Sequence, residues 1–433
     1  MGLTASTGHV CGWAVVVVVV GLMLAGCHAP PLATPTDPVL EGRYTDAARL
    51  VRADVEDDKR DRRYVLTRMR AGVMELAADQ PKRAEGSLAE VYDLLRTQGV
   101  NRDKMLETVV VNEGVRVWKG EPFEQALAMT YFGLTAGVLG SWDNVRAAAQ
   151  SSLFQLRDFG QAGRSGRPSH AGNGYVVTAS DFTLGYLLHG IASQQLGRDD
   201  KARDFLDRAI RLNPALKPMR DRLWTQPYNA VLVASYGLGP RKEAHGPSNA
   251  LSRFVPVFAS TNAPLAVKVN GQRQDDAHVV TDVNRMATDH RWNHLEDLRV
   301  TKANLGQASI LAGSVLTSDG LEYDNDRTAM IGLGLLAMGA YLEYQAKANT
   351  DYCDVFPQRF YVLPLWLEPE DSASAGSTVE LQVSDRATAS ARLQGLKGAA
   401  TGQPAKLIYF RLPAYNGSRS GVHRNRRANP LWR

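Results

Sequence analysis

Cysteine is scarce in this sequence: only Cys11, Cys27 and Cys353 occur among its 433 residues. The first two fall in or next to an apolar N-terminal segment that has features of an export signal. Cys353 is then left without a partner, so we expect no intramolecular disulfide. A lone thiol more often packs in the interior than acts as a nucleophile, and we expect that role for Cys353.

The sequence also lacks the short motifs of several enzyme classes. It contains no HExxH zinc motif, no P-loop and no GxSxG nucleophile turn. The stretch "GLGP" from Gly237 to Pro240 lacks the strand–GxGxxG–helix context of a nucleotide-binding loop. We therefore expect no cofactor.

Most of the chain lacks an excess of charge. The formal net charge is +5, and residues 416–433 alone carry five arginines and no Lys, Asp or Glu. The rest of the chain is therefore formally neutral, which argues against a nucleic-acid partner. We expect the 416–433 tail to be disordered. It is either an idle terminus or a contact for an anionic membrane lipid or lipopolysaccharide. The arginines assigned to that contact are Arg419, Arg424, Arg426 and Arg427.

The N-terminal apolar segment is short. It runs from Val10 to Ala25, which is less than the ~20 residues of a spanning helix. This favours a signal peptide over residues 1–26, with an uncleaved short anchor as the alternative. Residues Leu24 to Cys27, "LAGC", resemble a bacterial lipobox. The resemblance implies a lipoprotein with its lipid, palmitate included, on Cys27.

Prolines follow the cysteine in the 27–44 segment. Pro30, Pro31, Pro35 and Pro38 favour an extended, semi-rigid linker. His28 stands where Asp would mark retention at the inner membrane. We therefore expect a lipid-anchored protein of the bacterial cell envelope, at the periplasmic face of the outer membrane.

Residues 45–226 contain a recurring helical pattern. The stretch "GIASQQLGRDDKARDFLDRAIRLNP" from Gly190 resembles a tetratricopeptide unit, with small residues where two helices cross. Weaker copies begin at Gly133 and Gly72. The residues assigned to repeat packing are Gly72, Gly133, Gly140, Gly190, Gly197, Ala202, Ala209 and Pro214. We expect an all-α, tetratricopeptide-like solenoid interrupted by a loop at 160–174; the alternative is a generic antiparallel helical domain.

Residues 227–415 change to a mixed pattern, so the fold class expected for the whole chain is α+β. Apolar or alternating residues predict strands, and Asn270-Gly271 predicts a hairpin turn. The predicted strands lie in "NAVLVASY" from Asn229, "LAVKVNGQ" from Leu265, "HVVTDVNRMA" from His278, "RFYVLPLWLEP" from Arg359, "STVELQVSD" from Ser377 and "AKLIYFRLPA" from Ala405. Helices are expected at about 292–316 and at 329–342, the second being a core helix because it is apolar but too short to span a bilayer. The strands after it predict a β-sandwich-like end.

The second half carries further features in a fixed order. These are "YGLGPRKEA" from Tyr236, Asp282-Val283, and Asp354 with Arg359 before "YVLP". With the helical repeats they resemble a poorly characterised family of bacterial tetratricopeptide-repeat lipoproteins, over about residues 62–369. That family tends to carry a lysine after the turn proline, and Arg241 and Lys242 both follow Pro240. The resemblance implies a fold but no reaction.

Several polar residues are candidates for chemistry. His290 and His294 are four residues apart, which suits a metal or polar site on one helix face, with Glu296 or Asp297 completing it. Other carboxylates that qualify are Asp276, Asp282, Asp289, Glu121 and Glu124. For each of them, a solvated surface or the first turn of a helix is the simpler explanation, and no catalytic residue is assigned.

Two functions remain open. A helical solenoid favours a protein-binding scaffold or adaptor with an envelope protein as its partner. The alternative is a hydrolase or transferase that modifies envelope glycan or peptidoglycan, with its site in the second half.

Overall fold

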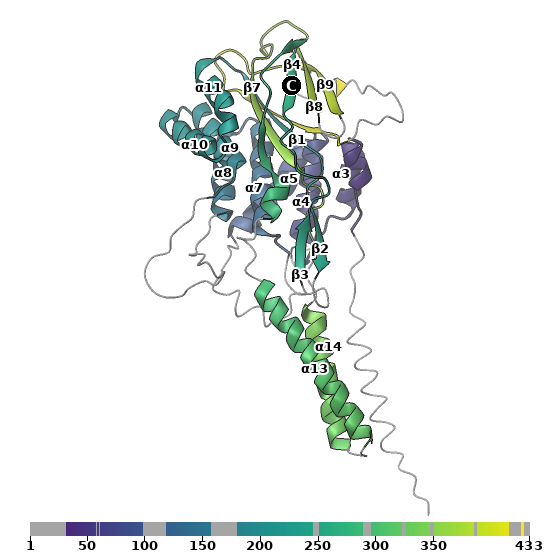
Figure 1. Ribbon diagram of the computed structural model, residues 1–433. Helices are drawn as coiled ribbons and strands as arrows, with labels where there is room; N and C mark the ends of the chain where they lie inside the picture. The colour runs from purple at the N-terminus through teal and green to yellow at the C-terminus, as the bar shows by residue number, and fades with distance from the viewer. Residues whose placement is uncertain are drawn as a thin grey trace, which may run out of the picture. The chain divides into compact units, whose positions relative to one another are not determined.

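The computed structural model describes residues 32–57, 59, 61–97, 118–156, 180–245, 251–288, 296–322, 326–346, 350–384, 388–414 and 426–427. The chain forms two compact units (Figure 1). One contains Ala244–Leu251 and Leu295–Ala348, and the other contains Thr34–Glu243, Ser252–His294 and Asn349–Arg433. The larger unit combines helices with sheets, so the prediction of an α+β chain is confirmed.

Antiparallel helix pairs make up the first layer of the larger unit (Figure 1). The helices are α2 (Thr36–Leu40), α3 (Tyr44–Ala53), α4 (Tyr64–Ala77), α5 (Pro81–Thr97), α7 (Pro122–Val138), α8 (Trp142–Gln155), α9 (Thr183–Gln195), α10 (Asp199–Leu212) and α11 (Lys217–Thr225). Helix α4 packs on α5, α7 on α8 and α9 on α10, and α5 contacts α7 as α8 contacts α9. Each pair thus adds to the previous one as a stack.

Glycines lie where the paired helices cross. A Cβ added at Gly190 would lie 2.7 Å from Leu206 Cγ, and one at Gly133 would lie 3.0 Å from Ala148 Cβ. Gly72 faces Leu88 in the same way. The remaining residues assigned to packing lie in the same pairs: Ala202 and Ala209 are buried, Gly140 and Gly197 have φ of +88° and +68° in the interhelical turns, and Pro214 opens a short 3₁₀ turn after α10.

Within the described ranges, the β structure consists of two sheets and a small two-stranded ribbon. The four-stranded sheet has the order β10-β1-β7-β6, the five-stranded sheet β11-β9-β8-β4-β5, and β2 pairs with β3. The strands are β1 (Ala230–Tyr236), β2 (Arg241–His245), β3 (Leu251–Val255), β4 (Leu265–Val269), β5 (Gln272–Arg273), β6 (Val279–Asp282), β7 (Arg359–Leu365), β8 (Ser377–Ser384), β9 (Thr388–Leu396), β10 (Lys406–Leu412) and β11 (Arg426–Arg427). Strand β1 is antiparallel to β7 and parallel to β10.

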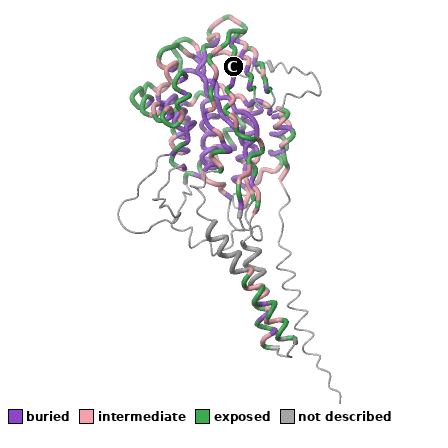
Figure 2. Tube along the Cα trace, in the orientation of Figure 1, coloured by how far each residue is buried: buried purple, intermediate pink, exposed green. Residues whose placement is uncertain are grey.

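The four-stranded sheet is the middle of three layers. On one face, Leu232 of β1 and Leu363 of β7 share a core with Leu381 of β8 in the second sheet. On the other face, β10 contacts α7 and α4, and the Tyr409 hydroxyl lies 3.2 Å from that of Tyr131. Every residue of β1 and β7 is buried, as a strand covered on both faces requires (Figure 2).

Several local predictions can be compared with this architecture. The Asn270-Gly271 hairpin is confirmed, since φ is +51° and +80° at the two residues and β4 pairs with β5. The strand expected from His278 onward ends at Asp282, and α12 (Val283–Thr288) follows. Of the tail, residues 426–427 are described, and their backbone pairs with β9. That pairing differs from the expected disorder. Arg419, Arg424, Cys27 and the 160–174 loop lie outside the described residues.

The smaller unit contains a helical hairpin of α13 (Glu296–Glu322) and α14 (Asp326–Ala346). The helix predicted at 329–342 is confirmed, because α14 spans it, but the prediction that it is a core helix is wrong. Ala329 and Gly332 are buried, but Met330 is 72% exposed and Ile331 60% exposed. Helix α14 is apolar on all sides, and α13 covers only part of it. None of the described helices meets the length and hydropathy needed to cross a bilayer.

Candidate functional site

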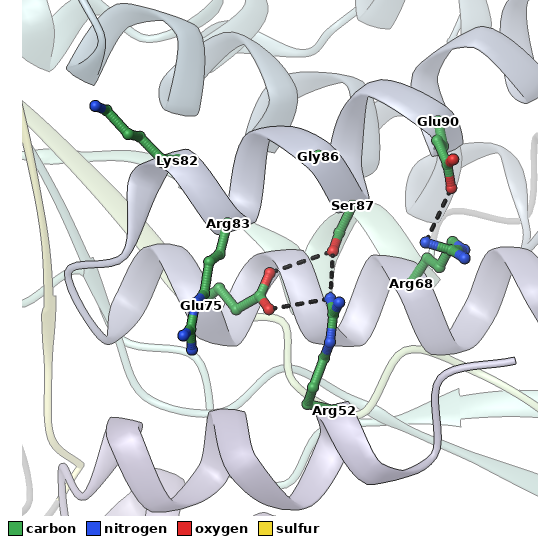
Figure 3. A pocket seen from close by; sticks show the side chains of 8 residues that line it. All are labelled: Arg52, Arg68, Glu75, Lys82, Arg83, Gly86, Ser87 and Glu90. Carbon is green, nitrogen blue, oxygen red and sulfur yellow. Dashed lines mark hydrogen bonds and ion pairs between the residues drawn. The ribbon is translucent and has the colours of Figure 1, made fainter. Parts of the chain in front are cut away.

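A pocket opens between α3, α4 and α5 of the helical stack (Figure 3). Its volume is about 610 Å³. The lining residues are Arg52, Arg68, Glu75, Lys82, Arg83, Gly86, Ser87 and Glu90. Four of them are cations and two are carboxylates, so the pocket favours an anionic ligand.

Helical spacing explains why these side chains meet. Arg68 and Glu75 are seven residues apart on α4, and Arg83 and Glu90 are seven apart on α5, so each pair lies on one face of its helix. A Cβ added at Gly86 would have no heavy atom within 4 Å, so the middle of the α5 wall is open. The two facing helices and α3 thus leave a depression lined by charge.

Glu75 forms the floor of the pocket. Its side chain is only 4% exposed, and it accepts hydrogen bonds of 3.2 Å from Arg52 Nη1 and from Ser87 Oγ. Burial raises the pKa of the Glu75 carboxyl, while Arg52, Ser87 and Arg83 act in the opposite direction. The Glu75 carboxylate at the floor is therefore already paired with Arg52.

The two walls differ in how their cations are paired. Arg68 lies 2.9 Å from Glu90 and stacks over the Tyr64 ring at 4.5 Å. Within the described part of the chain, Lys82 and Arg83 form no ion pair, and Arg83 donates only to the amide of Gln80 at 3.3 Å. These two residues lie in the first turn of α5, where the helix dipole adds positive potential. The positive charge available to a ligand is therefore on the α5 wall.

The sequence motifs of the second half meet elsewhere, at the start of α7. Glu121 caps this helix, and its N–H donates to Glu124 Oε2 at 2.9 Å in a capping box. Glu124 Oε1 accepts the N–H of Cys353 at 2.8 Å, and Lys242 Nζ donates to Glu121 Oε1 at 2.8 Å. Burial raises the pKa of Glu124 to about 7, against the lowering effect of Lys242. The two glutamates thus begin a helix, which was the simpler of the two explanations.

Asp354 makes a second buried ion pair. Arg70 Nε and Nη2 donate to its two carboxylate oxygens at 2.7 and 3.1 Å, and Arg70 Nη1 donates to Asp54 at 3.1 Å. Arg359 is also buried, with its guanidinium 5.4 Å from the centre of the Tyr236 ring. Asp354 and Lys242, from the sequence motifs of the second half, thus form ion pairs with residues of the helical half.

The other candidate carboxylates have structural partners. Asp276 pairs with Arg273 at 3.1 Å beside the β4–β5 hairpin. Asp282 accepts the N–H of Asn284 at 2.9 Å at the start of α12. Cys353 is buried, as expected, and burial raises the pKa of its thiol well above the usual value. Glu296 and Asp297 begin α13, while Asp289, His290 and His294 lie outside the described residues. Across the described ranges, no three His, Cys, Asp or Glu residues are placed to hold a metal ion.

The pocket residues were missed by the sequence analysis. One sequence pattern could have indicated the pocket, because a spacing of three to four residues puts charged side chains and a glycine on one helix face. The residues in this pattern are Lys82, Arg83, Gly86, Ser87 and Glu90. Their neighbours on α3 and α4 are distant in sequence. The pocket is therefore a property of the packing of three helices.

Comparisons with known proteins add little to this geometry. No family model matches the chain, and no curated protein matches it. Among solved structures, one titled "Crystal structure of MamA" is 17% identical with a TM-score of 0.20, covering 43% of this chain and 98% of that one. Another, "MamA MSR-1 C2", is 14% identical with a TM-score of 0.18, covering 42% and 92%. Scores this low carry no argument about fold or function.

Proposed function

We propose that this chain is a tetratricopeptide-like lipoprotein of the bacterial envelope that binds a protein partner through its helical stack. The observation that carries the proposal is the pocket between α3, α4 and α5, on whose α5 wall Lys82 and Arg83 form no ion pair with any described residue. Stacked helix pairs commonly present such surfaces to peptides. The partner segment that fits this one is acidic.

The charges of the pocket favour a ligand that carries a carboxylate. Glu75 and Glu90 form ion pairs with Arg52 and Arg68, and Arg83 also acts on Glu75 at longer range, so the two carboxylates offset only part of the charge of the α5 wall. An incoming carboxylate gains Lys82 and Arg83 as partners, together with the N-terminus of α5. An uncharged segment gains none of these contacts. Affinity is therefore expected to fall with rising salt.

The envelope location rests on the sequence alone. It follows from the apolar segment before Cys27 and the "LAGC" resemblance. The expected extended linker over 27–44 is wrong for Thr36–Leu40, which form helix α2 with Pro38 buried. Lipidation of Cys27 would hold the helical stack near a membrane and its resident proteins. This location makes an envelope protein the natural partner.

The hydrolase alternative gains no support from a specific contact. Asp276 and Asp282 are each engaged in local structure. Glu124, the carboxylate whose pKa is raised to about 7, is buried at a helix start. We therefore retain a binding role rather than a reaction.

A peptide titration tests the proposal. A fluorescent glutamate-rich peptide should bind the wild-type chain, and its glutamine counterpart should bind at least about tenfold more weakly, which corresponds to about 1.4 kcal/mol. The double variant Lys82→Glu/Arg83→Glu should lose the difference between the two peptides. Lys268→Glu on β4, also exposed, is the control and should bind as wild type. Equal binding of both peptides to the wild type would exclude an acidic ligand.

A further inference from the structure

Exposed apolar side chains are concentrated on the α13–α14 hairpin. Eleven large hydrophobic side chains are exposed among the described residues, and six of them lie on this hairpin. They are Leu311, Val315, Leu321, Met330, Ile331 and Met338. A protein surface rarely gathers this many in one place unless it makes a contact.

Charge is absent from the same part of the hairpin. Residues 303–318 of α13 and 328–342 of α14 contain no Lys, Arg, Asp or Glu. The two stretches lie side by side, because a Cβ added at Gly332 would be 2.8 Å from the carbonyl oxygen of Gly313. They form an uncharged band about 24 Å long at 1.5 Å per residue. Helices that are apolar on all sides need cover on more than one side.

The exposed face of α14 has both protrusions and a depression. Ile331, Gly334 and Met338 are exposed and spaced by three and four residues, so they share one face. A Cβ added at Gly334 would have no heavy atom within 4 Å. A side chain of another helix can enter the space above Gly334 while Ile331 and Met338 flank it. A surface that carries both shapes is self-complementary, which is the requirement for a two-fold contact between identical chains.

We propose that the α13–α14 hairpins of two copies of this chain pack together as an antiparallel four-helix bundle and make the protein a dimer. The closed end of each hairpin is acidic, with Asp319, Glu322 and Asp326 against a single Arg327. An antiparallel arrangement keeps the two acidic ends apart, whereas a parallel one brings like charges together. The same acidic end disfavours insertion into an anionic bilayer.

The area available is sufficient for a stable contact. Burying one large aliphatic side chain removes about 60–120 Å² from water. Six from each copy give an apolar contact on the order of 1,000 Å², which is the lower range of specific protein interfaces. Four-helix bundles bury such faces in the same way.

Sedimentation of the full-length chain in mild detergent over a dilution series tests the proposal. The wild type should show a dimer that dissociates on dilution. Ile331→Gln/Met338→Gln should raise the dissociation constant at least tenfold, with an unchanged helical circular dichroism spectrum. The control Leu50→Gln/Leu212→Gln removes two exposed apolar side chains elsewhere and should remain dimeric. A wild type that is monomeric at every soluble concentration overturns the proposal.

Single cysteines test the orientation. In an antiparallel bundle, Gly334→Cys at the middle of the band should form an intermolecular disulfide, and Leu321→Cys near the acidic end should not. Efficient crosslinking of Leu321→Cys alone would overturn the antiparallel arrangement. A monomeric wild type that binds anionic vesicles through Ile331 and Met338 would instead assign the face to a membrane.

Discussion

At the scale of single residues, Glu124 is held in the interior by opposing effects. Two backbone N–H groups, those of Glu121 and Cys353, donate to its oxygens and favour the charged form. Burial favours the neutral form more strongly, and the pKa rises from 4.5 to about 7. The folded state therefore binds more protons than the unfolded state between these two pH values, so stability falls as pH rises through that window.

This sign gives a testable prediction. The unfolding free energy of the wild type should decrease by up to about 3 kcal/mol from the Glu124 contribution as pH rises from about 4.5 to above 7. Glu124→Gln should remove that part of the slope, because the amide does not titrate. Urea unfolding at several pH values measures both chains. Glu380→Gln, at a partly exposed carboxylate on β8, is the control and should keep the wild-type slope. Parallel slopes for the wild type and Glu124→Gln would contradict the raised pKa.

At the scale of elements, two helical glycines have opposite surroundings. A Cβ at Gly190 in α9 would lie 2.7 Å from Leu206 Cγ, whereas one at Gly86 in α5 would meet nothing within 4 Å. Gly190→Ala should therefore destabilise the chain by about 1–3 kcal/mol through overpacking. Gly86→Ala should stabilise it by about 0.5–1 kcal/mol, since alanine favours a helix interior.

Thermal unfolding of the two alanine variants separates these effects. Gly190→Ala should melt below the wild type and Gly86→Ala above it. The two substitutions add the same methyl group, so the comparison isolates the packing at the helix crossing. An unchanged melting curve for Gly190→Ala would mean that α9 and α10 do not cross as closely as described.

Periodicity explains which elements were predictable. The helix pairs and strands β1, β4, β7, β8 and β10 have regular apolar spacing or apolar runs, and they were expected. Strands β2, β3 and β9 were missed. "RKEAH" and "LSRFV" carry few alternating apolar residues, and in "TASARLQGL" the alternating residues are two small alanines and Leu393. The partners of buried charges could not be predicted from the sequence, because residues as distant as Arg70 and Asp354 come together only in the folded chain. The same holds for the pocket, which three helices build together.

At the scale of the whole molecule, the lipid predicted on Cys27 would hold the protein at a membrane. If Cys27 carries the lipid, Cys27→Ser should leave a longer precursor that takes up no radiolabelled palmitate. Cys11→Ser changes a cysteine inside the expected signal peptide and should mature normally. Gel mobility and label incorporation in cells measure both. Equal labelling of wild type and Cys27→Ser would contradict the lipoprotein prediction.

Strand β10 has a consequence for the order in which the molecule is built. It lies beside β1 with Ala230 opposite Lys406, and Trp142 Nε1 donates to the carbonyl oxygen of Ala405 at 2.9 Å. Ala414 N–H in turn donates to the carbonyl oxygen of Leu40 at 3.1 Å. Contacts across so long a stretch of chain form slowly, because the intervening loop must close first. Until residues 406–414 arrive, β1 has an open edge and α7 lacks its cover. A chain that leaves the ribosome from its N-terminus therefore stays incompletely folded for most of its synthesis.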